Sequence, residues 1–253
     1  VLALARYVHP RKPPYQFRDL LWPIAMIAIP VILLLREPDL GTAGILLLSG
    51  MLILFLADIS WKFFATSAAL FFLSLPILWS RLYEYQKQRV LTFLNPDSDP
   101  LRKGYHILQS KIALGSGGVW GKGWLMGSQS HLQFLPEKQN DFVFTMFVEE
   151  WGFIGASLLL LMYTIWLSYG SLIAFTARQK FAALVALGIT SISFFHIFIN
   201  IAMVMGMAPV VGVPLPLMSY GGTSMLTIWL GQGIICAFAI SRQLRLNSGR
   251  MLS

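Results

Sequence analysis

The sequence predicts an all-α polytopic membrane protein with six transmembrane helices and one large extracytoplasmic loop. Hydrophobic residues make up 56% of the 253 residues and charged residues only 12%, about half the charged share of an average soluble domain. The mean hydropathy is +0.67. The charges lie at the ends of long apolar runs, so the net charge of +8 forms no basic stripe of the kind that binds nucleic acid.

Six apolar stretches are long enough to cross a bilayer, which takes about 20 residues, with a range down to ~17. Each should be a helix, because backbone polar groups cannot be left open in lipid. The stretch Phe181–Ser241 contains no Asp, Glu, Lys or Arg, and it divides at a segment rich in Pro and Gly. The predicted spans are Leu20–Leu35, Leu40–Ala57, Phe63–Ser80, the stretch after Asp141 to about Tyr169, about Phe181–Met205 and about Gly222–Ile240.

The short loops predict that both termini of this chain are cytoplasmic, because Lys and Arg concentrate on the cytoplasmic side. Bases lie before the first span, between the second and third, between the fourth and fifth, and after the sixth. On the other side, the loop 36–39 holds one base and the loop 206–221 holds none. The cytoplasmic set is Arg6, Arg11, Lys12, Arg18, Lys62, Arg178, Lys180, Arg242, Arg245 and Arg250.

The segment 81–141 is then an extracytoplasmic loop within a single membrane domain, 1–253. It holds eight bases and five acids, with aromatic residues spaced among them. This mixture predicts short interfacial helices on the membrane surface. The chain starts at Val1, and residues 1–6 are typical of a helix leaving the membrane, so we expect the C-terminal part of a longer protein.

Four features of the sequence are candidates for chemistry. The glycine-rich segment 115–123 is either a flexible hinge or a diphosphate or sugar contact, to which Lys111 and Lys122 would supply charge. Asp141 is either a helix cap or a carboxylate at the membrane interface that acts as a base. Glu149 and Glu150, about eight residues into the fourth span, are either a structural network or a functional polar interior.

The fourth candidate is the charge-free segment 200–222, which is rich in Gly and Pro. Irregular backbone at membrane depth persists only where it lines a cavity or is buried in protein. This segment is therefore either a tight re-entrant turn or the wall of a groove for an extended lipid. His196 is assigned to helix packing, and no spacing of His and Cys indicates a dedicated metal site.

Several motifs in sequence order resemble the SEDS family of polytopic glycosyltransferases in bacterial cell-wall synthesis. The resemblance covers essentially the whole chain. Two positions depart from the family pattern: Asn140 stands where Thr is usual, and Trp151 where Leu is usual. The matching motifs are Glu37–Ala43, Asp97–Pro100, Gly104–Ala113, Gly121–Trp124, Phe134–Glu137, Asp141–Phe144, Pro209–Pro216 and Ser219–Gly222.

The resemblance implies a peptidoglycan glycosyltransferase of the bacterial inner membrane that polymerises lipid II during cell elongation and cell-shape maintenance. It implies about ten membrane helices in the whole protein, and it places the general base at Asp141. The acceptor hydroxyl would attack the anomeric carbon of the undecaprenyl-diphosphate-linked donor. The residues expected to bind substrate are Glu137, Ser219 and Tyr220, with Arg102, Lys111 and Lys122 as candidates to neutralise the leaving diphosphate.

The expected partners are lipid II, the undecaprenyl-diphosphate glycan, a class B penicillin-binding protein transpeptidase and other proteins of the elongation complex. A divalent cation, Mg²⁺ or Mn²⁺, would be held partly by the substrate diphosphate. Two other functions stay open at this point. One is a flippase for the lipid-linked precursor, which the acids and the broken segment would suit. The other is a non-catalytic scaffold for the transpeptidase.

Overall fold

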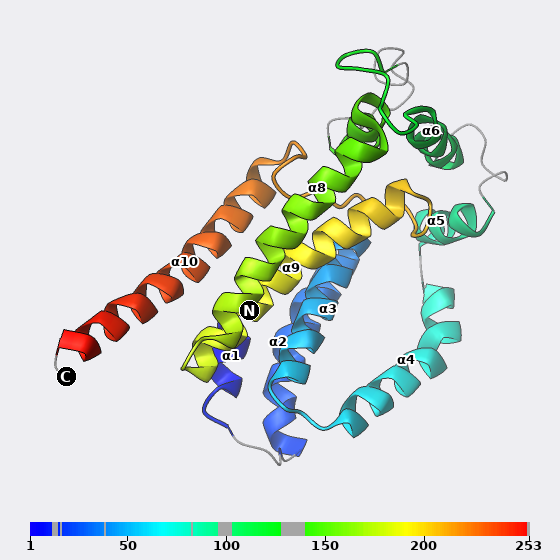
Figure 1. The fold of residues 1–253 in the computed structure, drawn as a ribbon. Coiled ribbons are helices and arrows are strands. Elements are labelled where there is room, and N and C mark those ends of the chain that lie inside the picture. Colours follow the sequence, from blue (N-terminus) through cyan, green and yellow to red (C-terminus); the bar gives the residue numbers. More distant parts are fainter. Residues whose placement is uncertain are drawn as a thin grey trace. The chain divides into compact units, whose positions relative to one another are not determined.

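The computed structural model describes residues 1–11, 15, 17–37, 39–81, 83–95, 103–127 and 140–251, and every regular element within these ranges is a helix (Figure 1). The predicted all-α fold class is confirmed. The helices are α1 (Leu2–Val8), α2 (Phe17–Arg36), α3 (Leu40–Leu56), α4 (Trp61–Arg81), α5 (Glu84–Leu94), α6 (Lys103–Ser116), α8 (Val143–Phe175), α9 (Lys180–Val204) and α10 (Gly222–Met251).

Each predicted span coincides with a helix. Within the described residues, four helices contain stretches long and apolar enough to cross a membrane: Arg18–Arg36, Val143–Phe175, Lys180–Val204 and Gly222–Ser241. The apolar stretches of α3 and α4 are shorter, Leu40–Leu56 and Trp61–Ile77. Two helices continue past their predicted spans, since α8 ends at Phe175 and α10 at Met251. Helix α8 is also interrupted at Gly152, where φ is 65° and ψ is −163°.

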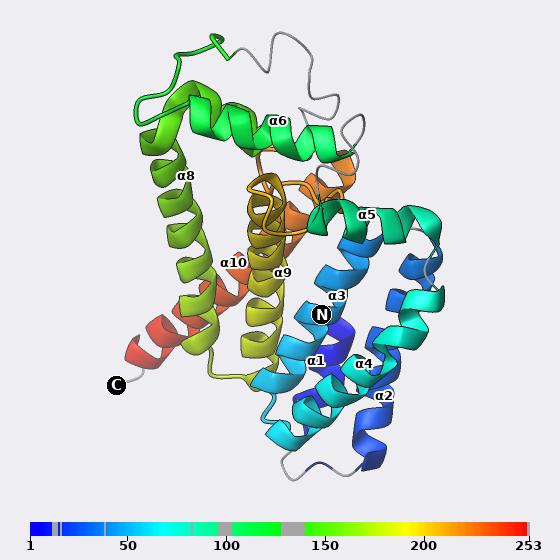
Figure 2. The same ribbon diagram turned by 90° about the vertical axis from the view of Figure 1, so that its right-hand side faces the viewer.

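The large loop contains two helices, α5 and α6, as the mixture of aromatic and charged residues predicts. The backbone N–H of Tyr83 donates to Oε1 of Gln86 (3.1 Å) at the start of α5. Figure 2 shows both helices lying across the direction of the first part of α8, which belongs to the same compact unit. They are short because their apolar residues do not extend over a full span.

The chain forms two compact units, and both are discontinuous in sequence. Unit 1 comprises Val1–Ala69, Ile165–Phe195 and Thr223–Ser253. Unit 2 comprises Leu70–Thr164 and His196–Gly222. Helices α4, α8 and α9 are therefore each divided between the two units.

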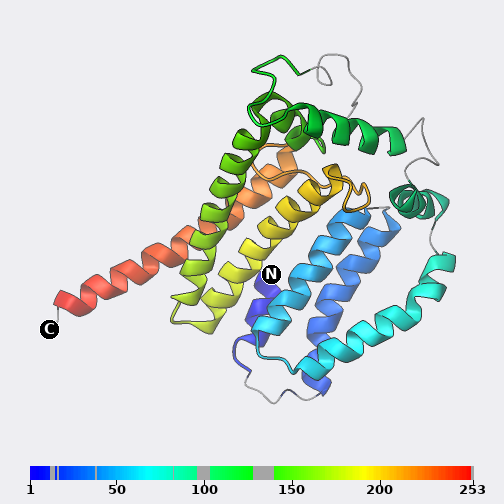
Figure 3. The same cartoon turned by 45° about the vertical axis from the view of Figure 1, so that its right-hand side comes forward.

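The core of unit 1 lies where α1, α2, α3 and α9 meet. Helices α2 and α3 lie side by side (Figure 3), and α1 packs against both. Gly50 permits this approach, because a Cβ there would lie 2.7 Å from Cγ1 of Ile27. The buried core residues are Leu4, Ala5, Val8, Leu20, Ile27, Ile53, Leu54, Ala57, Ile59, Leu184 and Val185.

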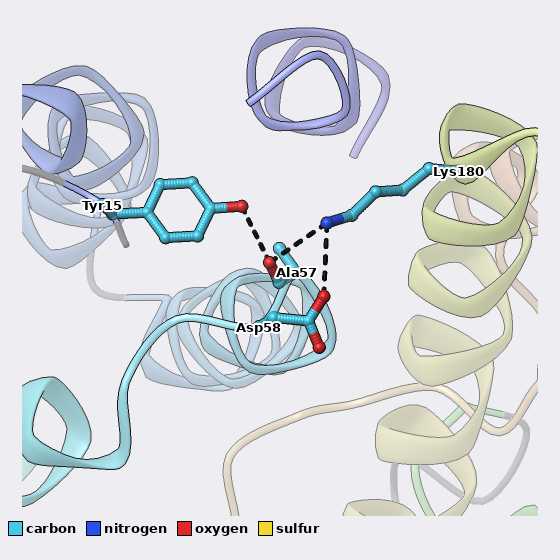
Figure 4. A network of polar contacts seen from close by, with 4 residues as sticks. All are labelled: Tyr15, Ala57, Asp58 and Lys180. Atoms are coloured by element: carbon cyan, nitrogen blue, oxygen red, sulfur yellow. Dashed lines mark hydrogen bonds and ion pairs between the residues drawn. The ribbon is translucent and has the colours of Figure 1, made fainter. Parts of the chain in front are cut away.

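A polar network joins three connecting segments at one end of unit 1 (Figure 4). The Tyr15 hydroxyl donates to the Ala57 carbonyl (2.8 Å). Lys180 Nζ donates to the same carbonyl and pairs with Oδ2 of Asp58, both at 3.3 Å. The segment before α2, the α3–α4 turn and the start of α9 thus lie together, which agrees with the prediction that they share one side of the membrane.

Candidate functional site

Asp141 lies in unit 2, in the turn that leads into α8. The first helical residue is Val143, so Asp141 precedes the helix and its side chain is half-buried. A Cβ on Gly212, whose φ is +73°, would lie 3.5 Å from Oδ2 of Asp141. The carboxylate therefore lies over the backbone of the segment rich in Pro and Gly that the sequence singled out.

Asn200, near the end of α9, connects the Asp141 turn to that segment. Its Nδ2 donates to the Asp141 carbonyl (3.0 Å) and to the Val213 carbonyl (2.7 Å). Asn200 is fully buried. One side chain thus satisfies two backbone carbonyls from segments far apart in the sequence, which in a buried setting is worth more than a surface hydrogen bond.

Ser219 makes a second bridge between the same two segments. Its hydroxyl donates to the Asn140 carbonyl (2.5 Å) and accepts from the Leu215 backbone N–H (2.7 Å). The Tyr163 hydroxyl of α8 donates to the Pro216 carbonyl (2.6 Å) and holds the segment from a third direction. Ser219, which the sequence analysis expects to bind substrate, therefore connects the residue before Asp141 to the segment rich in Pro and Gly.

Helix α6, which belongs to the large loop, packs against the start of α8 and the end of α9. The buried Ser110 hydroxyl donates to the Val204 carbonyl (2.8 Å) and lies 2.7 Å from Oγ1 of Thr145. Lys111, the next residue, is exposed and crosses Gly206, where a Cβ would lie 2.7 Å from its Nζ. Lys111 is thus placed at the turn that ends α9, in the same unit as Asp141.

The glycine-rich segment packs against the break in α8, and its backbone replaces the hydrogen bonds that the helix loses there. The backbone N–H groups of Lys122 and Gly123 donate to the carbonyls of Glu149 and Glu150, both at 3.0 Å. In return, the N–H groups of Phe153 and Ile154 donate to Gly118 (2.9 Å) and Val119 (3.2 Å). Residues 117–123 therefore form an ordered turn joined to α8.

This docking requires glycine on both sides of the contact. A Cβ on Gly121 would lie 2.1 Å from the Glu150 carbonyl oxygen, and one on Gly152 would lie 2.3 Å from the Gly121 nitrogen. Both residues also have positive φ, at 78° and 65°. Four backbone hydrogen bonds thus join the turn to α8, and the two alternatives that the sequence left open, a hinge or a diphosphate or sugar contact, stay predictions.

A buried ion pair accompanies the backbone bonds. Nζ of Lys122 lies 2.6 Å from Oε1 of Glu149, whose side chain is fully buried, whereas 28% of the Lys122 side chain is exposed. Glu150 is half-buried. The two acids that the sequence treats together thus differ, since Glu149 is the one that neutralises Lys122.

The remaining predicted site residues divide into two groups. Tyr220 follows the buried Ser219 and is 80% exposed. Glu137 and Arg102 lie outside the described residues. Among the residues that the structure describes, no three His, Cys, Asp or Glu side chains are grouped so that they could hold a metal ion.

Sequence reasoning missed the two connections that hold the Asp141 turn. Asn200 marks the start of the charge-free segment, but a lone Asn in an apolar helix gives no indication of its partners. The signal available in the sequence was its position in a long span without charged residues, because a polar side chain in such a span needs hydrogen-bond partners.

Residues 1–245 match the family described as cell cycle protein, which groups FtsW, RodA and SpoVE. The chain belongs to this family. The resemblance to SEDS proteins seen in the motifs is confirmed, and with it the assignment to a multi-pass protein of the bacterial inner membrane.

Curated relatives are similar over nearly the whole chain. The peptidoglycan glycosyltransferase MrdB of Escherichia coli K12 is 43% identical over 244 residues, which cover 96% of this chain and 66% of that protein. The peptidoglycan glycosyltransferase RodA of Treponema pallidum is 42% identical over 154 residues, 61% of this chain and 36% of that protein. The chain therefore spans about two thirds of the length of MrdB.

Solved structures share the fold. A chain from a study of how a peptidoglycan synthase complex coordinates polymerization and crosslinking has a TM-score of 0.77 and 29% identity, covering 95% of this chain and 66% of that one. The rod shape determining protein RodA of Thermus thermophilus has a TM-score of 0.59 and 26% identity, covering 92% and 60%.

Proposed function

We propose that the whole protein is a peptidoglycan glycosyltransferase that polymerises lipid II into glycan strands during cell elongation and cell-shape maintenance. The observation that carries the proposal is the Asp141 turn, a half-buried carboxylate whose backbone is fixed by Asn200 and Ser219. Relatives named as peptidoglycan glycosyltransferases support it. A base that acts on a sugar hydroxyl must be held in one position, and these two bridges supply that rigidity.

In the proposed reaction, Asp141 takes the proton of the acceptor sugar hydroxyl while the oxygen attacks the anomeric carbon of the donor. The new glycosidic bond forms as the bond to the diphosphate breaks, and undecaprenyl diphosphate leaves with its electron pair. Because the diphosphate is already stabilised as an anion, no second carboxylate acid is needed, in contrast to glycoside hydrolysis.

The charge on the leaving diphosphate needs cations. Lys111 is the described candidate, because its exposed side chain crosses the Gly206 turn in the same unit as Asp141. Lys122 is paired with Glu149, so we propose that it contributes less than Lys111 to neutralising the diphosphate. We propose that any Mg²⁺ or Mn²⁺ is held through the substrate diphosphate, and that Glu137, Tyr220 and Arg102 contact the substrate.

We further propose that both termini of this chain are cytoplasmic, which places the Asp141 turn on the outer side. There it would meet a lipid-linked substrate and a class B penicillin-binding protein transpeptidase. The structural relative from a synthase complex that coordinates polymerization and crosslinking supports such a partner.

The test is to supply the purified full-length protein with lipid II and no other polymerase. Glycan product supports the enzyme. Transfer of lipid II between leaflets without glycan product would instead indicate a flippase, and neither result in an otherwise folded protein would indicate a scaffold.

A further inference from the structure

The turn 119–126, which we name the tryptophan turn, exposes apolar side chains and directs its charged side chain inward, which is the reverse of a water-exposed loop. Trp120 is 83% exposed, Trp124 is 68% exposed and Met126 is 71% exposed. Between the two tryptophans, Lys122 points inward to the buried Glu149. The apolar side chains thus face outward while the charged one is neutralised inside, which is the arrangement expected of a surface in contact with lipid.

The exposed surface of the tryptophan turn continues onto α8. The ring of Trp124 makes an edge contact with that of Trp151, at a centroid separation of 6.4 Å. Beyond the break, Phe153 is 68% exposed and Ile154 is 45% exposed. The turn therefore extends the apolar face of a helix that is long and apolar enough to cross a membrane.

The length of α8 indicates the depth at which the tryptophan turn lies. From Phe153 to Phe175 the helix rises about 34 Å at 1.5 Å per residue, slightly more than the ~30 Å hydrocarbon core of a bilayer. No Asp, Glu, Lys or Arg occurs from Trp151 to Ala177. One end of this charge-free run is the break where the turn docks, so the turn lies at a boundary of the hydrocarbon core.

We propose that the tryptophan turn is an interfacial membrane anchor, with Trp120 and Trp124 inserted at the boundary between lipid headgroups and acyl chains on the Asp141 side. Tryptophan is enriched at this depth because its ring is apolar and its N–H can reach water. Since the turn is hydrogen-bonded to Glu149, Glu150, Phe153 and Ile154, the anchor also sets the depth of the break in α8. The proposal does not depend on the reaction that the protein catalyses.

Native tryptophan fluorescence tests the contact with lipid. The full-length protein is reconstituted into phosphatidylethanolamine and phosphatidylglycerol vesicles containing lipids brominated at shallow or deep acyl positions. Subtracting the spectrum of Trp120→Phe/Trp124→Phe from that of the unsubstituted protein gives the fluorescence fraction of these two tryptophans. This fraction should be quenched more by shallow than by deep bromines, and it should be protected from aqueous iodide. Quenching of that fraction by iodide and not by bromolipid would overturn the proposal, as would protection from both, which would indicate that protein covers the turn.

Spin labels provide a second measurement that does not use tryptophan fluorescence. In a cysteine-free background of the full-length protein that includes Cys236→Ser, Leu158→Cys reports the depth of α8 and Gln179→Cys is the aqueous reference, both residues being exposed. Adding Trp120→Ser/Trp124→Ser should lower the ratio of oxygen to nickel-complex accessibility at position 158 at least twofold and leave position 179 unchanged. An unchanged ratio at position 158 would show that the turn does not set the depth of the helix.

Discussion

At the scale of single residues, the site depends on Asp141 and on the two side chains that fix its backbone. If Asp141 were only a helix cap, Asp141→Asn would be nearly neutral, because Asn caps about as well as Asp. If it is the base, Asn cannot accept the proton. We expect the full-length Asp141→Asn protein to lose glycan synthesis by ~10²–10⁴-fold, measured as product from lipid II, with a melting temperature close to wild type. Near-normal synthesis would return Asp141 to a capping role.

Asn200 should matter for both stability and activity. Asn200→Leu leaves the carbonyls of Asp141 and Val213 without this partner, and a buried unsatisfied group costs about 1–3 kcal/mol. We expect a lower melting temperature and a fall in kcat with little change in KM, because the Asp141 turn loses its support. Ser193→Ala on the same helix is the control, since that buried hydroxyl bonds only within its own helix, to Ile189 (3.4 Å). Equal effects of the two substitutions would argue against a positioning role for Asn200.

At the scale of elements, the break in α8 and the turn docked on it form one structural device. Gly121→Ala places a Cβ 2.1 Å from the Glu150 carbonyl oxygen at a φ of +78°, and the backbone strain alone is about 1–3 kcal/mol. We expect a clearly lower melting temperature and weaker protection of the Phe153 amide from hydrogen exchange. Gly115→Ala on α6 is the control, because nothing lies within 4 Å of its Cβ position. The docking contact would be refuted if both variants melted alike.

The Lys122–Glu149 pair should couple energetically across the same device. Glu149→Gln removes the negative charge that lies 2.6 Å from Nζ of Lys122, and breaking a buried pair typically costs about 3–5 kcal/mol. We expect a value at the low end, because Lys122 keeps 28% of its side chain exposed. A double-mutant cycle with Lys122→Met, measured by thermal unfolding in detergent, should give less destabilisation than the sum of the two single variants. Glu150→Gln is the matched control, and additive effects at Lys122 and Glu149 would show that the two do not interact.

At the scale of the whole molecule, the orientation is the property on which the proposed reaction depends. In a cysteine-free background of the full-length protein that includes Cys236→Ser, Gln88→Cys on α5 should react with an impermeant thiol reagent in intact spheroplasts. Ser60→Cys in the α3–α4 turn should react only after permeabilisation; both residues are exposed. The opposite labelling pattern would reverse the topology and remove the Asp141 turn from the outer side. The network of Tyr15, Ala57 and Lys180 (Figure 4) predicts that Ser60 shares its side of the membrane with the start of α9.

The sequence by itself determined the helical spans, because burial in lipid is a local requirement that hydropathy reports residue by residue. It also determined the position of Asp141 at the start of α8 and the irregular backbone after α9, since Pro, Gly and the absence of charge are visible in the printed order. The family followed from the motifs for the same reason.

The tertiary structure alone decided which of these segments meet. Nothing in the sequence pairs Asn200 with the carbonyls of Asp141 and Val213, or Lys122 with Glu149, because hydrogen bonds between distant segments depend on three-dimensional packing and not on periodicity. The break at Gly152 was equally hidden, since an isolated Gly in an apolar helix is tolerated and only the docked turn 117–123 satisfies the backbone groups that the break exposes.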